Sequence, residues 1–127
     1  MDNVNHPEHY TKASVVMEPI TVCETLPFCQ GNAFKYVVRA MYKGNYKEDL
    51  QKALWYLNHC SNKSNYFGSD AEVLLKFYTL NSGNPILENA MSRTIKACNG
   101  DMISCYFWDE LKTEIEATLG NLKDEGD

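Results

Sequence analysis

Long apolar runs are absent from this chain of 127 residues. None approaches the roughly 20 consecutive apolar residues that a membrane-spanning helix needs. The N-terminal stretch MDNVN also lacks the basic and apolar regions of a signal peptide. We therefore expect a cytoplasmic protein with no membrane partner.

Cysteines in a pairing pattern are missing as well. The five cysteines are an odd number, and no two of them form a CxxC motif. The sequence thus predicts a reducing compartment and no disulfide framework. His59 lies beside Cys60, and His6 and His9 are three residues apart, but neither spacing matches a zinc site. We predict free cysteines and no metal bound by Cys and His.

The motifs of several enzyme classes are also absent. There is no phosphate-binding loop GxxxxGKS/T, no dinucleotide-binding GxGxxG, no nucleophile elbow and no HExxH motif. Residues 32–60 lack the acidic pairs with which all-α nucleotide pyrophosphatases bind metal. Glu110, Glu114 and Glu116 near the C-terminus are interpreted as a solvated helix face.

Acidic residues are absent between Thr25 and Lys47, although the formal charge of the whole protein is −5. Lys35, Arg39 and Lys43 recur there at four-residue intervals, with Lys47 one interval further on. Like charges four apart on a helix repel each other by roughly 0.2–0.5 kcal/mol per pair. One interpretation of the pattern is a bound anion, for which phosphate is the commonest candidate. A solvated basic face paired with acids elsewhere is the equally open alternative.

The two halves of the chain differ in charge. Residues 1–64 carry a net charge of +1 and residues 65–127 carry −6. The acidic half would repel the phosphates of duplex nucleic acid, which we do not expect as a partner. Single-stranded nucleic acid, stacked on Tyr36, Tyr42 and Tyr46, is a weaker alternative.

Helical periodicity predicts an all-α fold. With 44% hydrophobic residues, the chain fits a single domain over residues 1–127. We expect a compact bundle of about five helices after an irregular N-terminal arm. A short helix should start near Pro19, and residues 11–17 allow a short strand. The main helices are expected at residues 32–43, 45–60, 70–80, 85–98 and 103–119.

The first two main helices should form an antiparallel αα-hairpin over residues 32–60, because the connection between them is short. Gly44 is expected to end the first of them, and Gly120 to follow the last helix of the chain. Asn84 is expected to start the helix that begins at Pro85.

A phosphate site is predicted on the first helix of the hairpin, where Asn32, Lys35, Arg39 and Lys43 share one face. If Asn32 is the N-cap, the backbone N–H groups near it and Gly31 add to an anion site. Lys35 then stands in the first turn, where the helix dipole disfavours a cation, which points to a binding role. Arg39 would present a planar fork to a phosphate, and Lys35 a movable point charge.

The second helix of the hairpin adds Asp49 and Lys52, for which the simplest interpretation is a surface ion pair. In a functional site, Asp49 would hold Arg39, orient a ligand hydroxyl or bind Mg²⁺, and Lys52 would contact phosphate. Trp55 and Tyr56 are interpreted as core or interface residues rather than a platform for base stacking.

The N-terminal segment is unusual in placing His6, His9 and Tyr10 beside Pro7. A histidine suits a phosphate contact or proton transfer, because its charge changes near neutral pH. The simpler interpretation is that Tyr10 and Pro7 hold the N-terminus against the helices. For His6 the sequence favours this simpler interpretation, and for His9 it leaves both open.

Together these residues resemble a known family. HPxHY over residues 6–10, GNAxKYxxRAxxK over 31–43 and DLxKAxWY over 49–56 resemble small proteins of tailed phages, mostly of unassigned function. The pattern is also similar to the C-terminal region of the nucleotide kinase of T7-like phages. That enzyme phosphorylates deoxynucleoside monophosphates without a conventional phosphate-binding loop. The resemblance covers residues 5–60.

This resemblance implies a phage early protein in the host cytoplasm that binds a nucleotide or other phosphate ligand and forms a homo-oligomer. For a kinase it implies ATP and Mg²⁺, with phosphoryl transfer as the reaction. The implied residues are the catalytic candidates His9 and Asp49, the phosphate-binding Gly31, Asn32, Lys35, Arg39, Lys43 and Lys52, and the supporting His6, Tyr10, Tyr36 and Tyr56.

The size and residue usage also resemble those of lactococcal-phage early proteins of the type called SaV. A host abortive-infection protein senses infection through proteins of that type. This resemblance implies the alternative function, a non-catalytic interaction protein that binds a host or phage protein.

Overall fold

The computed structural model describes residues 17–42, 45–59, 68–99 and 103–124. These ranges contain six α-helices, one 3₁₀ turn and no strand, so the all-α prediction is confirmed for them. The residues proposed for a short strand lie almost wholly outside these ranges. In chain order the elements are α2 (Pro19–Cys23), α3 (Phe28–Ala40), α4 (Tyr46–His59), α5 (Ser69–Asn81), α6 (Pro85–Cys98), η2 (Ile103–Cys105) and α7 (Phe107–Asp124).

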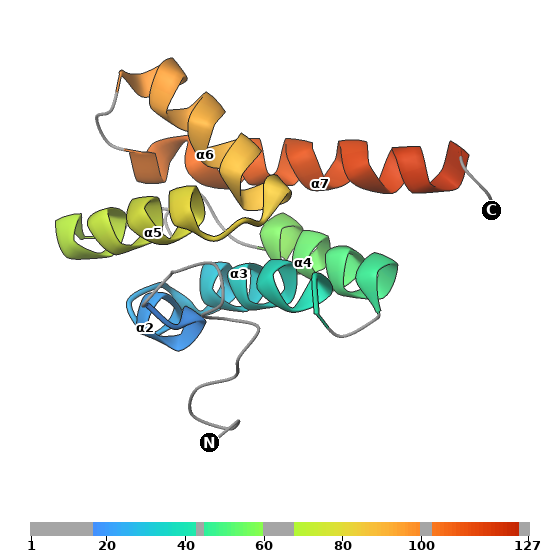
Figure 1. Cartoon of the computed structure of the whole chain (residues 1–127), viewed down its shortest axis with the longest axis horizontal. Coiled ribbons are helices and arrows are strands. Elements are labelled where there is room, and N and C mark those ends of the chain that lie inside the picture. The colour runs from blue at the N-terminus through green and yellow to red at the C-terminus, as the bar shows by residue number, and fades with distance from the viewer. Residues whose placement is uncertain (1–16, 43–44, 60–67, 100–102, 125–127) are drawn as a thin grey trace.

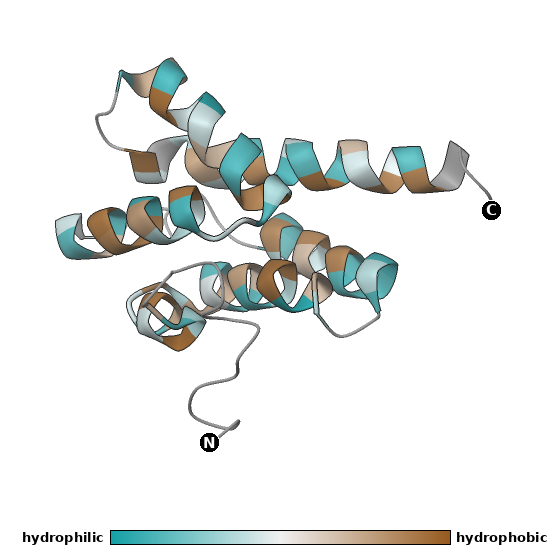
Figure 2. Cartoon of the chain, viewed as in Figure 1, coloured by the Kyte–Doolittle hydropathy of each residue, from teal (hydrophilic) through white to brown (hydrophobic). Residues whose placement is uncertain are grey.

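The helices pack as two pairs, and α5 packs against α6 (Figure 1). Helices α3 and α4 run side by side as the predicted hairpin, and α6 packs on α7. Helix α4 also contacts α7, while the short α2 contacts both α3 and α5. Hydrophilic and hydrophobic residues alternate along α6 and α7 (Figure 2), as expected for helices with one face in water.

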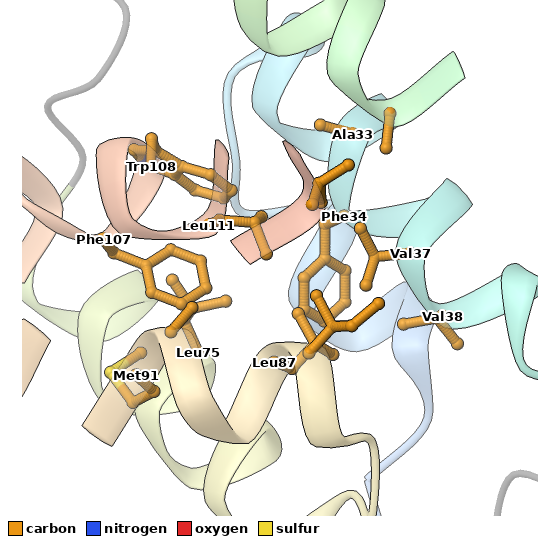
Figure 3. Packing of buried hydrophobic residues seen from close by; sticks show 14 of the residues in the cluster. Ala33, Phe34, Val37, Val38, Leu75, Leu87, Met91, Phe107, Trp108 and Leu111 are labelled. Carbon is orange, nitrogen blue, oxygen red and sulfur yellow. The ribbon is translucent and has the colours of Figure 1, made fainter. Parts of the chain in front are cut away.

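A single core fills the space between these pairs (Figure 3). Phe34 is fully buried there, and its ring meets that of Tyr78 edge-on at 5.4 Å between centroids. One face of α3 is therefore fixed to the core, which leaves the exposed Lys35 on another face. The labelled core residues are Ala33, Phe34, Val37 and Val38 of α3, Leu75 of α5, Leu87 and Met91 of α6, and Phe107, Trp108 and Leu111 of α7.

Helix α3 begins four residues earlier than predicted. Its N-cap is Pro27, and its first residue is Phe28, so the predicted start at residue 32 is wrong and Asn32 is not the N-cap. The φ of proline is fixed near the value that a helix entry requires, which makes Pro27 a suitable boundary. The Asn32 side chain instead donates a hydrogen bond to the Phe28 carbonyl at 2.9 Å. The helix ends at Ala40, before the predicted residue 43.

The start of α6 agrees with its prediction, whereas the end of α7 differs. Asn84 caps α6 as predicted, since its Oδ1 accepts hydrogen bonds from the backbone N–H groups of Ile86 and Leu87 at 3.0 and 3.2 Å. The predicted end of the last helix before Gly120 is wrong, because α7 continues to Asp124. A single glycine costs a helix only about 1 kcal/mol relative to alanine, which does not end a helix of this length.

Candidate functional site

Two lysines from different helices lie over one aromatic ring. The Nζ atoms of Lys35 on α3 and Lys52 on α4 are 4.7 and 5.5 Å from the centroid of the Tyr36 ring. The face of an aromatic ring attracts cations, by about 0.5–1 kcal/mol at exposed sites. Tyr36 thus gathers two like charges at the surface of the hairpin.

Tyr36 belongs to an aromatic cluster that we define as Phe28, Tyr36, Trp55, Tyr56 and His59. Tyr36 stacks on Tyr56 with centroids 6.0 Å apart, and Phe28 meets Tyr56 edge-on at 6.3 Å. Trp55 meets Tyr56 edge-on at 5.1 Å and stacks on His59 at 4.0 Å. Phe28 and Trp55 are 75% and 54% exposed. Trp55 is therefore not a core residue, and the aromatic cluster is a surface feature.

Asp49 lies inside the hairpin and faces Arg39. The Arg39 Nε atom is 3.6 Å from Asp49 Oδ2, and the side chains are 43% and 1% exposed. Neither carboxylate oxygen accepts a hydrogen bond from the described residues. Of the roles predicted for Asp49, the geometry supports holding Arg39, because the guanidinium balances the charge of the buried carboxylate.

The interpretation of Asp49 and Lys52 as a surface ion pair is wrong, because Asp49 is buried. Lys52 lies instead 3.8 Å from Glu48, one turn away on α4, with both side chains well exposed. Such an exposed pair within one helix contributes only about 0.3–0.5 kcal/mol. Lys52 therefore remains available to a ligand.

An open hollow of about 380 Å³ lies between α2 and the first half of α3. Most of its lining is apolar, and the exposed Lys35 also lines it. Gly31 lets the helices approach here, since a Cβ at this position would lie 3.3 Å from the Cys23 carbonyl oxygen. The lining residues are Pro19, Ile20, Cys23, Glu24, Leu26, Pro27, Phe28, Gly31, Asn32 and Lys35.

The predicted anion site at the backbone of Gly31 and Asn32 is not present in that form. Both residues lie within α3, and the Gly31 N–H donates to the Pro27 carbonyl at 2.8 Å. Lys35 stands in the middle of the helix, so the argument from the helix dipole no longer applies to it. Its candidacy now depends on its position over Tyr36 and beside the hollow.

Four predicted site residues lie outside the described residues. These are His6, His9, Tyr10 and Lys43.

The prediction of a solvated acidic face on the last helix is wrong for two of its three residues. Arg93 of α6 binds both Glu110 and Glu114, with its Nε 2.8 Å from Glu110 Oε1 and one terminal nitrogen 2.7 Å from Glu114 Oε1. Glu116 is exposed as expected. Ion pairs between different helices leave no local signal in a sequence, so this contact between α6 and α7 was not predicted.

No group of three or more His, Cys, Asp and Glu side chains placed to hold a metal ion occurs among the described residues. None of the helices found there has the length and apolar character needed to cross a membrane.

Residues 4–58 match a protein family described as a protein of unknown function, DUF3310. The matched segment contains α2, α3 and nearly all of α4. No curated protein and no solved structure shows a significant match to the chain. The predicted family segment over residues 5–60 is thus confirmed, while the phage and kinase resemblances stay predictions.

Proposed function

We propose that the surface around Tyr36 binds the phosphate groups of a nucleotide or other phosphate ligand. The observation that carries this proposal is the convergence of Lys35 and Lys52 over one ring. Two ammonium groups gathered in this way repel each other. A phosphate bound between them would remove the repulsion and accept charge-assisted hydrogen bonds from both.

Arg39 extends this cationic surface. It lies one helical turn beyond Lys35 on α3, and its side chain is 43% exposed although its Nε faces Asp49. The buried carboxylate restrains the guanidinium, and a restrained planar fork suits a second phosphate group. The site therefore fits a ligand that carries more than one phosphate, or two ligands side by side.

The more specific form of the proposal is a deoxynucleoside monophosphate kinase that uses ATP and Mg²⁺. Phosphoryl transfer depends mainly on positioning and on neutralising charge, which a cluster of Lys35, Lys52 and Arg39 supplies in principle. The family resemblance supports this form, with His9 as a candidate catalytic residue. Asp49, the other candidate, is buried against Arg39 and would act by positioning that guanidinium.

Calorimetric titration with deoxynucleoside monophosphates and triphosphates tests binding. We expect Lys35→Ala and Lys52→Ala each to weaken binding about tenfold, because each removes a charged hydrogen bond worth about 1.5 kcal/mol or more. Lys96→Ala is the matched control, since Lys96 is an exposed lysine on α6. The absence of binding at millimolar nucleotide, or an equal loss in the control variant, would refute the proposal.

Incubation with ATP, Mg²⁺ and each deoxynucleoside monophosphate, followed by chromatography, tests the kinase form. A deoxynucleoside diphosphate should appear with wild type and diminish strongly in Lys35→Ala. If every monophosphate remains unchanged while binding persists, the kinase form is wrong and the binding function stands.

A second candidate function, binding of a host or phage protein, is favoured by the exposed side of α5. Val73, Phe77 and Leu80 follow the spacing i, i+4, i+7 and are all exposed. Three apolar side chains at this spacing form a stripe of the kind by which helices dock on partners. Its position on α5 separates this stripe from the proposed phosphate site.

Capture of partners from host lysate separates the two functions. An interaction through this stripe should be lost in Phe77→Glu and kept in Lys35→Ala. The reverse pattern would assign the captured partner to the cationic surface, and equal capture by both variants would exclude the stripe.

A further inference from the structure

We infer that the hollow between α2 and α3 seats a nucleobase, so that the ligand held by Lys35 is a nucleotide and not a phosphate compound in general. This inference rests on the proposed phosphate site. It adds a second part to that site, because phosphate binding by the lysines does not by itself need the hollow.

The size and lining of the hollow suit a flat aromatic group. Its volume of about 380 Å³ is near the lower end of the range for small-molecule sites, roughly 300–1,000 Å³. Ile20, Leu26 and Pro27 give it apolar walls. A base is largely apolar on its faces and polar at its edges, which matches apolar walls with a few polar groups among them.

The hollow and the phosphate site share two residues. Lys35 lines the hollow and also lies over the Tyr36 ring. Phe28 lines the hollow and also packs its ring against Tyr56 in the aromatic cluster. A ligand with its base in the hollow would therefore have its phosphate group within reach of Lys35.

Phe28 offers the stacking surface. It is 75% exposed at the first position of α3 and meets Tyr56 edge-on, so most of its surface is open to a stacked base. Bases stack on aromatic rings whatever their sequence identity, because every base has a π-face. Stacking on Phe28 would cover this ring.

The polar groups around the hollow orient such a ligand. Glu24 and Lys35 both line it, and their opposite charges direct a phosphate toward Lys35 and away from Glu24. The Asn32 amide nitrogen is held by the Phe28 carbonyl, which leaves the amide oxygen as an acceptor for an N–H group at the edge of a base.

The test compares two probes that differ only in the base, deoxyadenosine monophosphate and 2-deoxyribose 5-phosphate. By calorimetry the first should bind wild type about tenfold more tightly, a difference equal to the loss of one stacked base. In Phe28→Ala this advantage should disappear, while affinity for 2-deoxyribose 5-phosphate stays within about twofold of wild type. Phe77→Ala, which removes another exposed phenylalanine on α5, should leave both affinities unchanged.

Methyl NMR locates the base directly. With isoleucine δ1 methyl labels, deoxyadenosine monophosphate should shift the resonance of Ile20, which lines the hollow, through the ring current of the base. Ile95 of α6 should not move. The base-free sugar phosphate should leave Ile20 unshifted.

Equal affinity for the two probes, or an unmoved Ile20 resonance, would overturn the inference and leave the phosphate site intact. If neither probe binds, the inference is refuted, and the phosphate site is refuted with it when the deoxynucleoside triphosphates also fail to bind. An Ile20 resonance that shifts with protein concentration, without any ligand, would show that a second copy of the chain occupies the hollow and would also overturn the inference.

Discussion

Arg39 has two roles, one in stability and one in the cationic surface, and a substitution would disturb both. It faces the buried carboxylate of Asp49 at 3.6 Å, and it also contributes to the cationic surface. Removing one member of a buried ion pair costs more than the pair contributes, because the other charge is left uncompensated out of water. Substitution of Lys35 or Lys52 therefore reports on binding more cleanly than substitution of Arg39.

We expect Arg39→Ala to lower the free energy of unfolding by about 1–3 kcal/mol. Breaking a fully buried pair costs about 3–5 kcal/mol, and the half-exposed guanidinium of Arg39 reduces this value. Lys35→Ala, which removes an exposed cation one turn away, should change stability by no more than about 0.5 kcal/mol. Adding Asp49→Asn to Arg39→Ala should restore much of the loss. Equal urea midpoints for Arg39→Ala and Lys35→Ala would contradict this prediction.

Because of Cys23, we expect the stability of the protein to fall as the pH becomes alkaline. Burial beside Gly31 raises the pKa of the Cys23 thiol from 9.0 to about 11. The folded state therefore keeps a proton that the unfolded state has lost in this range. The resulting stabilisation is complete below pH 9 and is lost as the pH rises to 11.

Wild type should accordingly lose up to about 2 kcal/mol more of its unfolding free energy than Cys23→Ala between pH 9 and 11. Urea titrations at several pH values measure this difference. Parallel curves for the two proteins would show that the thiol has the same pKa in the folded and unfolded states.

At the scale of elements, Asn84 joins two helices that are distant in sequence. Its Oδ1 caps α6, and its Nδ2 donates to the Val37 carbonyl of α3 at 3.2 Å in a buried position. This bond ties the helix that carries the cations to the second helix pair. The position of Lys35 and Arg39 thus depends on a residue more than forty positions away.

Asn84→Ala should lower the free energy of unfolding by about 1–3 kcal/mol, because it removes both the cap and the buried hydrogen bond. Asn84→Ser keeps a cap acceptor and should recover about half of that loss. Thermal unfolding followed by circular dichroism measures both variants. If serine and alanine are equally destabilising, the cap contributes nothing here.

At the scale of the whole molecule, the described helices of the segment that matches the family share one core with the helices beyond it. Phe34 on the apolar side of α3 meets the ring of Tyr78 of α5 at 5.4 Å between centroids and lies beside Leu87 of α6 (Figure 3). Helix α4 likewise packs on α7. The hairpin therefore needs residues beyond the matched segment in order to bury its apolar faces.

A fragment of residues 1–60 should therefore lack a cooperative unfolding transition and a native near-ultraviolet circular dichroism signal. In this fragment α2, α3 and α4 lose partners of their buried faces, and short helices without such packing are only marginally stable in water. The full chain under the same conditions is the control. A sharp transition in the fragment would show that the segment is an independent domain.

Local patterns were enough to predict the helices and the hairpin, because periodicity and capping act within a few residues. The cap at Asn84 and the sharing of one face of α3 by Lys35 and Arg39 were predicted on this basis. The start of α3 was missed, since Asn32 and Pro27 are both acceptable entries to a helix and local chemistry does not choose between them. Because the start was missed, Phe28 was not predicted as a site residue, although its place directly after Pro27 could have indicated the first residue of a helix.

By itself, then, the sequence determined the all-α class, the hairpin and a cationic face free of acids. Only the tertiary structure decided which charges meet: it buried Asp49 against Arg39, and it paired Arg93 with Glu110 and Glu114. It also brought Lys52 to the ring on which Lys35 already lay. The physical reason is that helix formation depends on near neighbours along the chain. A site depends instead on which side of each helix is buried in the core, because that packing brings together residues far apart in sequence.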